Sequence, residues 1–394
     1  MSSLSYMEKL LEGVEIEWKA LGGVCRFING RAYKKPELLE EGKYTVLRVG
    51  NFFTNDRWYH SNLELPEDKY CDNGDLLYAW SASFGPRIWG GEKVIYHYHI
   101  WKVVPNENMI LKKFLFYLLE WDVKSLKDEH ATGSTMLHVS KGSIEKRLVP
   151  IPCPENPEKS LKIQAEIVRI LDAFTELATE LTTELNARKK QYNYYRDQFL
   201  RFEDGEVEWK ALGALAENLD SMRKPITSGL RESGEIPYYG ASGIVDYVKD
   251  YIFDGDFLLV SEDGANLLAR NTPIAFSISG KNWVNNHAHV LKFETYAERR
   301  YVEYYLSSID LTPYISGAAQ PKLNQRNLNS ISIPNPSLEE KERIVAILDK
   351  FYTLSNSISE GLPREIELRH KQYEYYRELL LSFPQSETDV VEKV

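Results

Sequence analysis

The sequence repeats itself in one order over most of its 394 residues, and this repetition constrains the fold more than any other feature. Glu17–Gly22 returns unchanged as Glu208–Gly213, and Lys190–Arg196 returns with one substitution as Lys371–Arg377. Four shorter segments recur between these two: Gly74–Leu77 as Gly255–Leu258, His97–Lys102 as His287–Lys292, Ile151–Pro154 as Ile333–Pro336, and Ile167–Asp172 as Ile344–Asp349. Such order predicts a tandem duplication of a unit of about half the chain.

The first part of each copy is predicted to be a mixed α/β domain. Short apolar runs separated by Gly, Asn and Asp are typical of strands, and longer periodic stretches are typical of helices. The predicted strands are Leu76–Trp80 and Val94–Val103 in the first copy and Phe257–Ser261 and His287–Phe293 in the second, and the predicted helices are Lys112–Glu120 and Ala297–Ser307. The expected fold class is α+β.

The second part of each copy is predicted to be a long helix. In the first copy, mostly apolar residues follow one another at alternating steps of four and three: Ile167, Leu171, Phe174, Ala178, Leu181, Leu185, Arg188, Tyr192, Tyr195 and Phe199. This heptad spacing favours packing against a partner helix as a coiled coil. The second copy carries four extra residues between Ile358 and Ile366, including Pro363. Because proline inside a helix costs about 3 kcal/mol, a break or kink is expected there.

The N-terminal residues match the end of a helix. Tyr6–Leu11 precedes the first copy of the repeated hexapeptide much as Tyr195–Leu200 precedes the second. The repeat is therefore circular, which the chain can achieve if its two long helices pair antiparallel about a pseudo-two-fold axis. A mixed α/β domain is then expected at each end of a helical rod. Two DNA-binding domains held at a fixed separation can recognise a DNA site that is split into two parts. The two domains here differ enough in sequence to predict unlike half-sites.

Composition narrows the alternatives. The net charge of −10 counts against simple nucleic-acid binding, although a basic stripe can lie on an acidic protein. Cys25, Cys71 and Cys153 are far apart, which disfavours a disulfide framework and fits a reducing cytoplasm. No signal peptide or membrane-spanning run is expected. The sequence also lacks the phosphate-binding loop of ATPases and the glycine-rich and Asn/Asp-Pro-Pro-aromatic loops of DNA methyltransferases.

Two repeated features point to a known family: the Ile-Pro-x-Pro segments that lead into helices and the Lys-Gln-Tyr-x-Tyr-Tyr-Arg helix ends. On these features the whole chain resembles the specificity (S) subunit of type I restriction–modification enzymes. The resemblance implies two target-recognition domains (1–157 and 204–336), a proximal helical arm (158–203), a distal helical arm (337–385) and a flexible tail (386–394).

The same resemblance implies a non-catalytic protein that reads an asymmetric bipartite target in double-stranded DNA. It implies docking of two copies of an adenine-N6 methyltransferase (M) subunit and of a motor-nuclease (R) subunit. The methyltransferase would hold S-adenosylmethionine, so no cofactor is expected in this chain.

Candidate DNA-contacting residues lie in loops and at strand ends of both domains. Basic side chains suit phosphate contact, and Asn, Gln and Arg can pair with base edges. In the first domain the candidates are Arg31, Lys34, Lys35, Asn51, Arg57, Ser83, Arg87, Ser134, Thr135 and Lys141. In the second domain they are Arg223, Lys224, Arg231, Asn266, Arg270, Asn271, Gln320, Lys322, Asn324 and Arg326. Solvated loops and polar turns before core strands are the alternative.

Tyrosines at the repeated helix ends are candidates for docking the methyltransferase, with packing on the adjacent domain as the alternative: Tyr192, Tyr194, Tyr195, Tyr373, Tyr375 and Tyr376. The pairs His97 with His99 and His287 with His289 have the spacing that places two side chains on one face of a strand, where they could ligate zinc. The sequence assigns no third ligand, so a structural role is favoured and no metal is expected.

Two other functions stay open. A coiled-coil adaptor that joins proteins without touching DNA is favoured by the acidic charge, and a metal-dependent enzyme would use the histidine pairs. Salt-dependent binding to duplex DNA distinguishes the DNA-reading function from the adaptor, and a stoichiometric bound metal would identify the enzyme.

Overall fold

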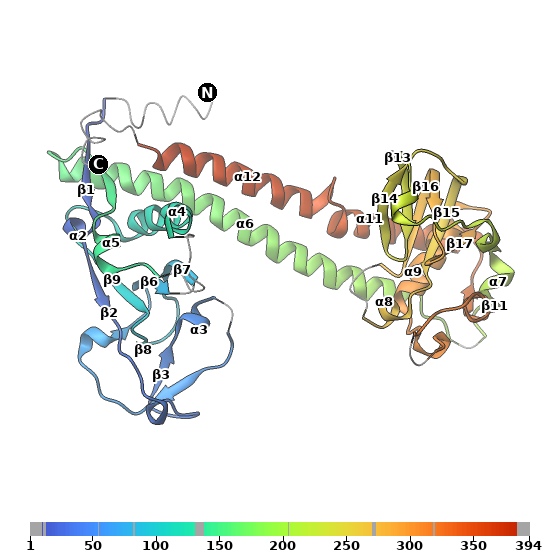
Figure 1. The fold of residues 1–394 in the computed structure, drawn as a ribbon, viewed down its shortest axis with the longest axis horizontal. Coiled ribbons are helices and arrows are strands. Elements are labelled where there is room, and N and C mark those ends of the chain that lie inside the picture. The colour runs from blue at the N-terminus through green and yellow to red at the C-terminus, as the bar shows by residue number, and fades with distance from the viewer. Residues whose placement is uncertain are drawn as a thin grey trace. The chain divides into compact units, whose positions relative to one another are not determined.

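The computed structural model describes residue 10 and residues 13–53, 55–81, 83–130, 138–203, 205–269, 273–317 and 320–383. The chain forms two compact units, of which unit 1 comprises residues 1–180 and 367–394 and unit 2 comprises residues 181–366. Each unit combines a mixed α/β domain with segments of long helix (Figure 1). The mixed α and β composition that the sequence predicts is therefore confirmed.

Unit 1 is built on two four-stranded sheets. The first has the antiparallel order β2-β9-β6-β7, with β2 (Cys25–Asn29), β9 (Ile100–Pro105), β6 (Leu76–Ser81) and β7 (Ser83–Ile88). The second has the order β4-β3-β8-β5, with β4 (Tyr59–Ser61), β3 (Tyr44–Leu47), β8 (Val94–Tyr96) and β5 (Tyr70–Cys71), and its β3 and β8 are parallel. The short helix α3 (Val49–Phe53) joins β3 to β4 and contacts β6 and β7.

Helices complete the core of unit 1. Helix α4 (Lys112–His130) packs on β7 and β9, and the start of α6 (Pro157–Phe199) joins the same hydrophobic core. Apolar side chains that are at most 2% exposed fill this core, among them Leu76, Tyr78, Trp101, Phe114 and Ile167. A separate antiparallel ribbon consists of β1 (Ile16–Ala20) and β10 (Leu148–Pro152), flanked by α2 (Leu21–Val24) and α5 (Lys141–Glu145).

Unit 2 carries one six-stranded sheet. Its order is β12-β17-β15-β16-β13-β14, with β12 (Glu217–Asn218), β17 (Ala288–Lys292), β15 (Phe253–Ser261), β16 (Ala275–Val284), β13 (Ser233–Gly240) and β14 (Gly243–Val248). Helix α9 (Tyr296–Ser308) packs on β15, β16 and α11 (Leu338–Asn356). The remaining elements are the ribbon of β11 (Glu208–Ala211) and β18 (Ser332–Asn335) and the short helices α7 (Leu212–Leu215), α8 (Gly264–Ala269) and α10 (Gln325–Asn329).

The predicted long helix of the first copy is continuous, and that of the second copy is broken. Helix α6 spans 43 residues, whereas α11 ends at Asn356 and α12 (Gly361–Leu381) begins after a gap. Gly361 has φ +73°, and a Cβ atom there would lie 2.5 Å from the Thr353 carbonyl oxygen. Pro363 lies in the first turn of α12, where backbone N–H groups have no helical acceptor. The expected break is thus confirmed.

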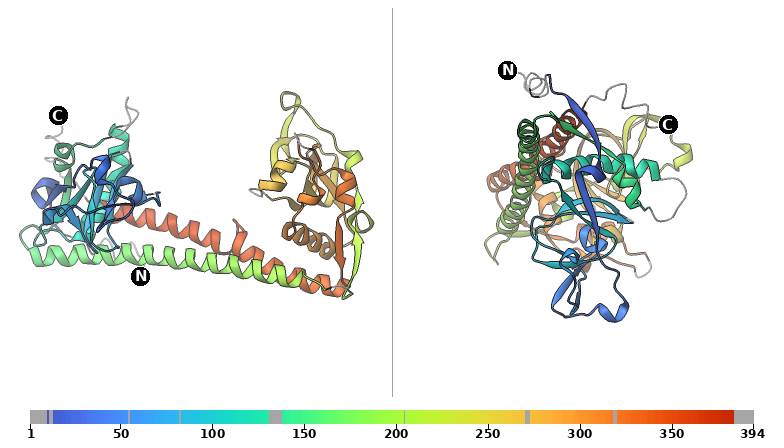
Figure 2. Two further views of the ribbon diagram at one scale, coloured as in Figure 1. Left: turned by 90° about the horizontal axis from the view of Figure 1, so that it is seen from below. Right: turned by 90° about the vertical axis from the view of Figure 1, so that its left-hand side faces the viewer.

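Aromatic pairs join the long helices within each unit. In unit 1, Phe174 of α6 stacks on Tyr376 of α12 with ring centroids 5.2 Å apart and planes at 21°. In unit 2, Tyr195 of α6 stacks on Phe351 of α11 at 5.5 Å and 22°. Figure 2 shows α12 lying beside the first part of α6 in a second orientation. Phe174 and Tyr195, two residues of the predicted seam, therefore each contact a second helix.

Two strand predictions need correction. The run Val94–Val103 is two strands, β8 and β9, because the chain turns at Tyr98 and His99 between them. His97 consequently lies in an isolated bridge with Arg31 and His99 lies in the turn. In the second copy, His287 precedes β17 and His289 lies within it. Helix α4 also extends beyond its predicted end to His130. In the described part of the chain, no helix has both the length and the hydropathy needed to cross a bilayer.

Candidate nucleic-acid interface

Three arginines of unit 1 lie on aromatic rings of α3 and β4. The Arg87 guanidinium lies 5.6 Å from the ring centroid of Phe52 and 5.9 Å from that of Phe53. Arg48 and Arg57 each lie 5.2 Å from the ring of Tyr59. A carboxylate partner for these three side chains is not found among the described residues. This arginine cluster, defined as Arg48, Arg57 and Arg87, leaves planar donors available for phosphates or guanine edges.

Asn51 organises the loop that carries Arg57. Its Nδ2 donates to the backbone oxygens of Asn55 and Arg57, both at 2.9 Å, and the backbone N–H of Arg57 donates to Asn55 Oδ1 at 2.8 Å. Asn51 is predicted from sequence to contact a base, and its Nδ2 instead binds the loop that follows α3. Sequence reasoning found Arg57 and Arg87 and missed Arg48, which lies immediately after β3.

The basic segment near the start of unit 1 is partly neutralised. Arg31 makes a bidentate pair with Glu37 at 2.8 and 3.1 Å, and its guanidinium also lies 5.3 Å from the ring of Tyr33. The hydrogen bond from Arg31 holds the pKa of Glu37 below its ordinary value. Lys34 and Lys35 are exposed at the 3-10 helix η1 (Lys35–Glu37). The two lysines are therefore more available to a phosphate than Arg31.

Aromatic and imidazole rings cluster beside the end of β6. The ring centroid of Trp80 lies 4.9 Å from that of His99 and 5.9 Å from that of His138. Trp80 Nε1 donates to the Tyr98 carbonyl oxygen at 2.9 Å. Burial, followed by the charges of His99 and Arg48, lowers the pKa of His97 to about 4. Groups of three or more His, Cys, Asp or Glu arranged to hold a metal do not occur among the described residues. The rings of this cluster instead contact one another.

Charged side chains of unit 2 form an ionic cluster, defined as Asp220, Arg223, Glu262, His289 and Lys322. Arg223 Nη1 lies 3.1 Å from Glu262 Oε2, and Lys322 Nζ lies 3.3 Å from Glu262 Oε1. His289 Nδ1 lies 2.6 Å from Asp220 Oδ2. A phosphate that approached Arg223 or Lys322 would therefore compete with Glu262.

Asp220 is the buried centre of this ionic cluster. Burial by itself would raise the pKa of Asp220, but the hydrogen bond and charge of His289, the Val290 N–H and Arg223 together lower it. His289 Nε2 also lies 2.7 Å from the Leu323 carbonyl oxygen. His289 is 1% exposed and His287 is exposed. The second histidine of the repeated pair thus holds the domain together, which is the structural role that the sequence favours.

The other predicted contacts of unit 2 are distributed over several elements. Arg231 pairs with Asp246 at 2.9 Å and lies 4.3 Å from the ring of Tyr238. Asn324 caps α10, since its side chain accepts a hydrogen bond from the Asn327 N–H. Four candidates of unit 2 are exposed: Lys224, Gln320, Asn324 and Arg326.

In each unit, the structure brings a predicted strand-end segment next to the predicted polar segment. An isolated bridge joins Ser81 to His138 in unit 1, and another joins Asp263 to Lys322 in unit 2. Gly264 N–H donates to the Pro321 carbonyl oxygen at 2.9 Å, and a Cβ atom at Gly264 would lie 2.3 Å from that oxygen. Segments that are far apart in sequence therefore share one surface in each unit, where Ser83 is exposed and Lys141 pairs with Glu145 at 3.6 Å.

Several candidates lie outside what the structure describes. Ser134, Thr135, Arg270 and Asn271 are not among the described residues, and the side chain of Asn266 is not described. Their contact with DNA stays a prediction.

One tyrosine of each repeated helix end faces outward. Tyr194 is 61% exposed and Tyr375 is 54% exposed, and they occupy the same place in the two copies. Tyr192 contacts Tyr304 and Tyr352, and Tyr373 donates to Glu120 at 3.3 Å. Tyr195 and Tyr376 form the stacked pairs described above. Tyr194 and Tyr375 are therefore the members of each group that a partner can reach.

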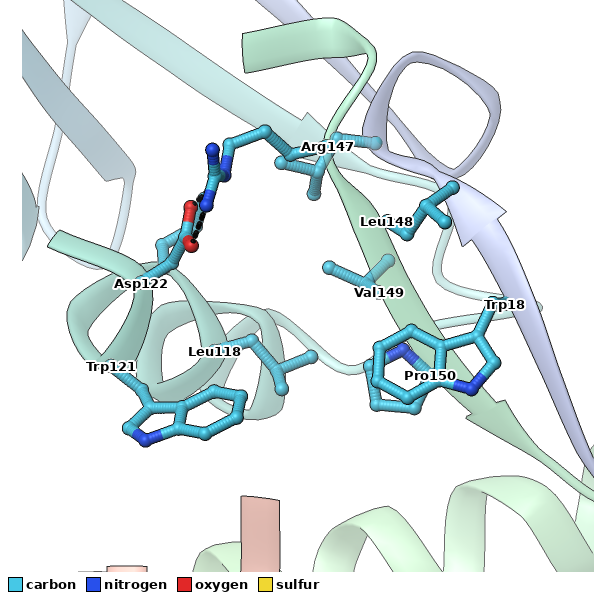
Figure 3. A pocket seen from close by; sticks show the side chains of 10 residues that line it. Trp18, Leu118, Trp121, Asp122, Arg147, Leu148, Val149 and Pro150 are labelled. Carbon is cyan, nitrogen blue, oxygen red and sulfur yellow. Dashed lines mark hydrogen bonds and ion pairs between the residues drawn. The ribbon is translucent and has the colours of Figure 1, made fainter. Parts of the chain in front are cut away.

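A small hollow in unit 1 lies beside the first repeated hexapeptide. Figure 3 shows Trp18 and Trp121 on two sides of it and the ion pair of Asp122 with Arg147 at its edge. Trp121 Nε1 donates to Glu378 Oε2 at 2.8 Å. The rest of the lining is apolar: Leu21, Leu118, Leu119, Leu148, Val149 and Pro150. This lining belongs to the packing of α4 on the ribbon rather than to the candidate interface.

Comparison with known proteins identifies the family. Residues 13–190 and 205–368 each match the family described as the type I restriction modification DNA specificity domain, so the internal duplication predicted from sequence is confirmed. The chain is 37% identical over 417 residues to the type I restriction enzyme EcoR124I/EcoR124II specificity subunit of Escherichia coli, covering 98% of this chain and 99% of that one. It is 36% identical over 396 residues to the EcoprrI specificity subunit of Escherichia coli, covering 91% and 93%.

Solved structures share the fold. The S subunit of a type I restriction–modification system from M. genitalium matches with a TM-score of 0.61 at 14% identity, covering 95% of this chain and 98% of that one. A structure reported for complex assembly and conformational transition of the type I R-M system matches with a TM-score of 0.60 at 15% identity, covering 93% and 98%. Two matched segments and near-complete coverage of both Escherichia coli relatives place the chain in one family: it belongs to the type I restriction–modification DNA specificity proteins.

Proposed function

We propose that this chain is the sequence-specificity subunit of a type I restriction–modification complex and reads an asymmetric bipartite target in double-stranded DNA. The curated relatives are specificity subunits over their whole length, and specificity subunits of this family are not catalytic. The domain of unit 1 reads one half of the target and the domain of unit 2 reads the other. The proposed domain boundaries are those expected from the sequence, with helical arms at 158–203 and 337–385.

The observation that carries the proposal is that the two units share a frame but differ in the charged side chains near it. Ser140 caps α5 and Asn324 caps α10, each immediately before the short helix that leads to the ribbon. Above this shared frame, unit 1 offers the arginine cluster with aromatic and imidazole rings, whereas unit 2 offers the ionic cluster. Unlike side chains on equivalent frames recognise unlike half-sites.

The proposal also includes pairing of the long helices, which would hold the two recognition domains apart. Phe174 and Phe351 are equivalent in the two copies, and so are Tyr195 and Tyr376. The pairs Phe174 with Tyr376 and Phe351 with Tyr195 have nearly the same distance and angle. This agreement supports antiparallel coiled-coil pairing about a pseudo-two-fold axis, which suits a target split into two parts.

Cations that have no carboxylate partner would allow an acidic chain to bind DNA. Arg31, Arg223 and Arg231 each pair with a carboxylate, as do Lys141 and Lys322, so a phosphate contact by any of these residues would compete with that pair. Arg48, Arg57 and Arg87 supply a local basic surface in unit 1. The other predicted residues stay in the proposal as phosphate or base contacts: Lys34, Lys35, Asn51, Ser83, Ser134, Thr135, Lys141, Lys224, Asn266, Arg270, Asn271, Gln320, Lys322, Asn324 and Arg326.

Partner subunits supply the chemistry in this proposal. Two copies of an adenine-N6 methyltransferase subunit dock through the helical arms, with Tyr194 and Tyr375 as outward contacts, and a motor-nuclease subunit joins for cleavage. S-adenosylmethionine is held by the methyltransferase. The complex works in the cytoplasm.

Domain exchange tests the proposal. Residues 207–335 are replaced by the matching residues of a relative, the chimaera is expressed with the methyltransferase, and methylated sites are mapped in genomic DNA. We expect one half of the recognised sequence to change while the other half and the spacer stay. A change in both halves contradicts modular reading. An unmodified chain that shows no salt-dependent binding to duplex DNA, even with the methyltransferase, would favour the adaptor function instead.

A further inference from the structure

Each recognition domain is tied to its long helix by an aspartate at the same place in the two copies. Asp172 of α6 and Asp349 of α11 both end the repeated Ile-Val-x-Ile-Leu-Asp segment. In unit 1, Asp172 accepts hydrogen bonds from Lys113 Nζ at 2.5 Å and from Tyr117 Oη at 2.7 Å. Lys113 and Tyr117 lie one helical turn apart on α4.

The same arrangement recurs in unit 2 with more donors. Asp349 accepts from Arg300 Nε at 3.0 Å, from Arg300 Nη2 at 2.8 Å and from Tyr304 Oη at 2.6 Å. Arg300 and Tyr304 also lie one turn apart, here on α9, and Tyr296 Oη adds a bond at 2.7 Å. In both units, therefore, the aspartate is bound by a basic residue and by a tyrosine that follows it one helical turn later.

Core packing by itself does not require these polar contacts. Tyr117 is 4% exposed and Tyr304 is 2% exposed, and burial followed by the bond to the aspartate raises the pKa of Tyr117. A buried phenol aimed at a carboxylate fixes direction as well as distance, since hydrogen bonds weaken steeply away from linearity. Apolar contacts between α4 or α9 and the long helices would permit sliding or rotation.

We infer that Asp172 and Asp349 are positioning residues that set the direction in which each recognition domain faces from its helix, and thereby the spacer length that the protein accepts between half-sites. The inference rests on the proposed function, because spacer length has meaning only for a two-part target. The aspartates touch no base, so the bases that are read do not depend on them.

The hydrogen bonds at Asp349 are better shielded from water than those at Asp172. Lys113 is 54% exposed at the side chain, whereas Arg300 is 11% exposed and its guanidinium also pairs with Glu303 at 2.5 Å. Charged hydrogen bonds gain strength when water is excluded. Removing the Asp349 charge should therefore loosen its domain more than removing the Asp172 charge.

The test measures spacer discrimination by the full chain in complex with its methyltransferase. Affinity is compared for duplexes that carry the native spacer or a spacer one base pair longer or shorter. For Asp349→Asn we expect the preference for the native spacer to fall by about tenfold, and for Asp172→Asn by about threefold. Base preference within each half-site should stay unchanged.

Matched controls separate positioning from stability. Lys162→Ala removes an exposed pair with Glu158 on α6 and should leave spacer preference as it is. Tyr304→Phe keeps the ring and loses the two hydrogen bonds of the hydroxyl, one donated to Asp349 and one accepted from Arg300, so it should lower spacer preference in a chain whose thermal unfolding stays close to normal. This variant tests the effect on spacer preference even if Asp349→Asn unfolds.

The outcomes distinguish the inference from the function beneath it. A wild-type complex that binds no specific two-part sequence overturns the proposed function and the inference together. If the wild type binds its target but Asp349→Asn and Tyr304→Phe keep full spacer preference, the inference alone is wrong. It is also wrong if base preference changes together with spacer preference.

Discussion

The buried pair of His289 with Asp220 gives the sharpest stability prediction. A carbonyl oxygen only accepts hydrogen bonds, so His289 Nε2, 2.7 Å from the Leu323 oxygen, must carry a proton. The other ring nitrogen, Nδ1, lies 2.6 Å from Asp220 Oδ2. The His289 side chain is 1% exposed and the Asp220 side chain is 5% exposed, so the pair is buried.

Replacing His289 by alanine leaves the Asp220 charge and the Leu323 carbonyl without this partner. Breaking a buried pair from one side costs about 3–5 kcal/mol. Val290 N–H, at 2.9 Å, and Arg223 still contact Asp220, so we expect the lower half, about 3–4 kcal/mol. For a unit of this size, each kcal/mol lowers Tm by about 2–4 °C, giving a fall of about 6–16 °C.

The measurement is thermal and urea unfolding of the full chain at neutral pH, followed by the transition that contains unit 2. His287→Ala is the matched control, because His287 is exposed and belongs to the same repeated pair. Its effect should stay within about 0.5 kcal/mol. A loss below about 1 kcal/mol for His289→Ala, or one equal to that of the control, would refute the assignment of this pair.

The pH dependence follows from Asp220. Its pKa in the folded chain lies below the ordinary value of 3.8. The unfolded chain therefore binds the proton more readily, so the stabilisation is fully present above about pH 4 and is lost as pH falls through the folded pKa. Asp220→Asn should consequently flatten the acid limb of the stability curve below pH 4, and an acid limb identical to that of the wild type would contradict this.

Two further predictions concern DNA. Arg87→Ala should weaken DNA binding and lower the slope of log affinity against log salt by about 0.9 if Arg87 contacts one phosphate. Lys93→Ala is the control and should leave the slope unchanged, because Lys93 pairs with Glu67. Equal slopes for the two variants would contradict phosphate contact by the arginine cluster. Insertion of four helical residues after Thr182 adds about 6 Å to α6, or between one and two base pairs at about 3.4 Å each. The methylation map should then show a longer spacer with the same bases, and an unchanged spacer would exclude a role for the helix in setting distance.

Short-range patterns explain what the sequence predicted well. The heptad spacing of α6 and the break before Gly361 depend on backbone geometry within a few turns. Duplication was also visible, because identical segments such as Glu17–Gly22 and Glu208–Gly213 need no structure to be matched. The turn at Tyr98 and His99 is not predicted, because aromatic and apolar residues on both sides of it continue the pattern that is typical of a strand.

The sequence by itself determined that the chain is a duplicated α/β unit joined to long helices, since periodicity and repetition are properties of neighbouring residues. Only the tertiary structure decided which cations are free and which are paired. Arg223 meets Glu262 across 39 positions and Lys113 meets Asp172 across 59, through strand order and helix packing. Charges attract at distances of a few ångströms, and that proximity is set by the fold rather than by position along the chain.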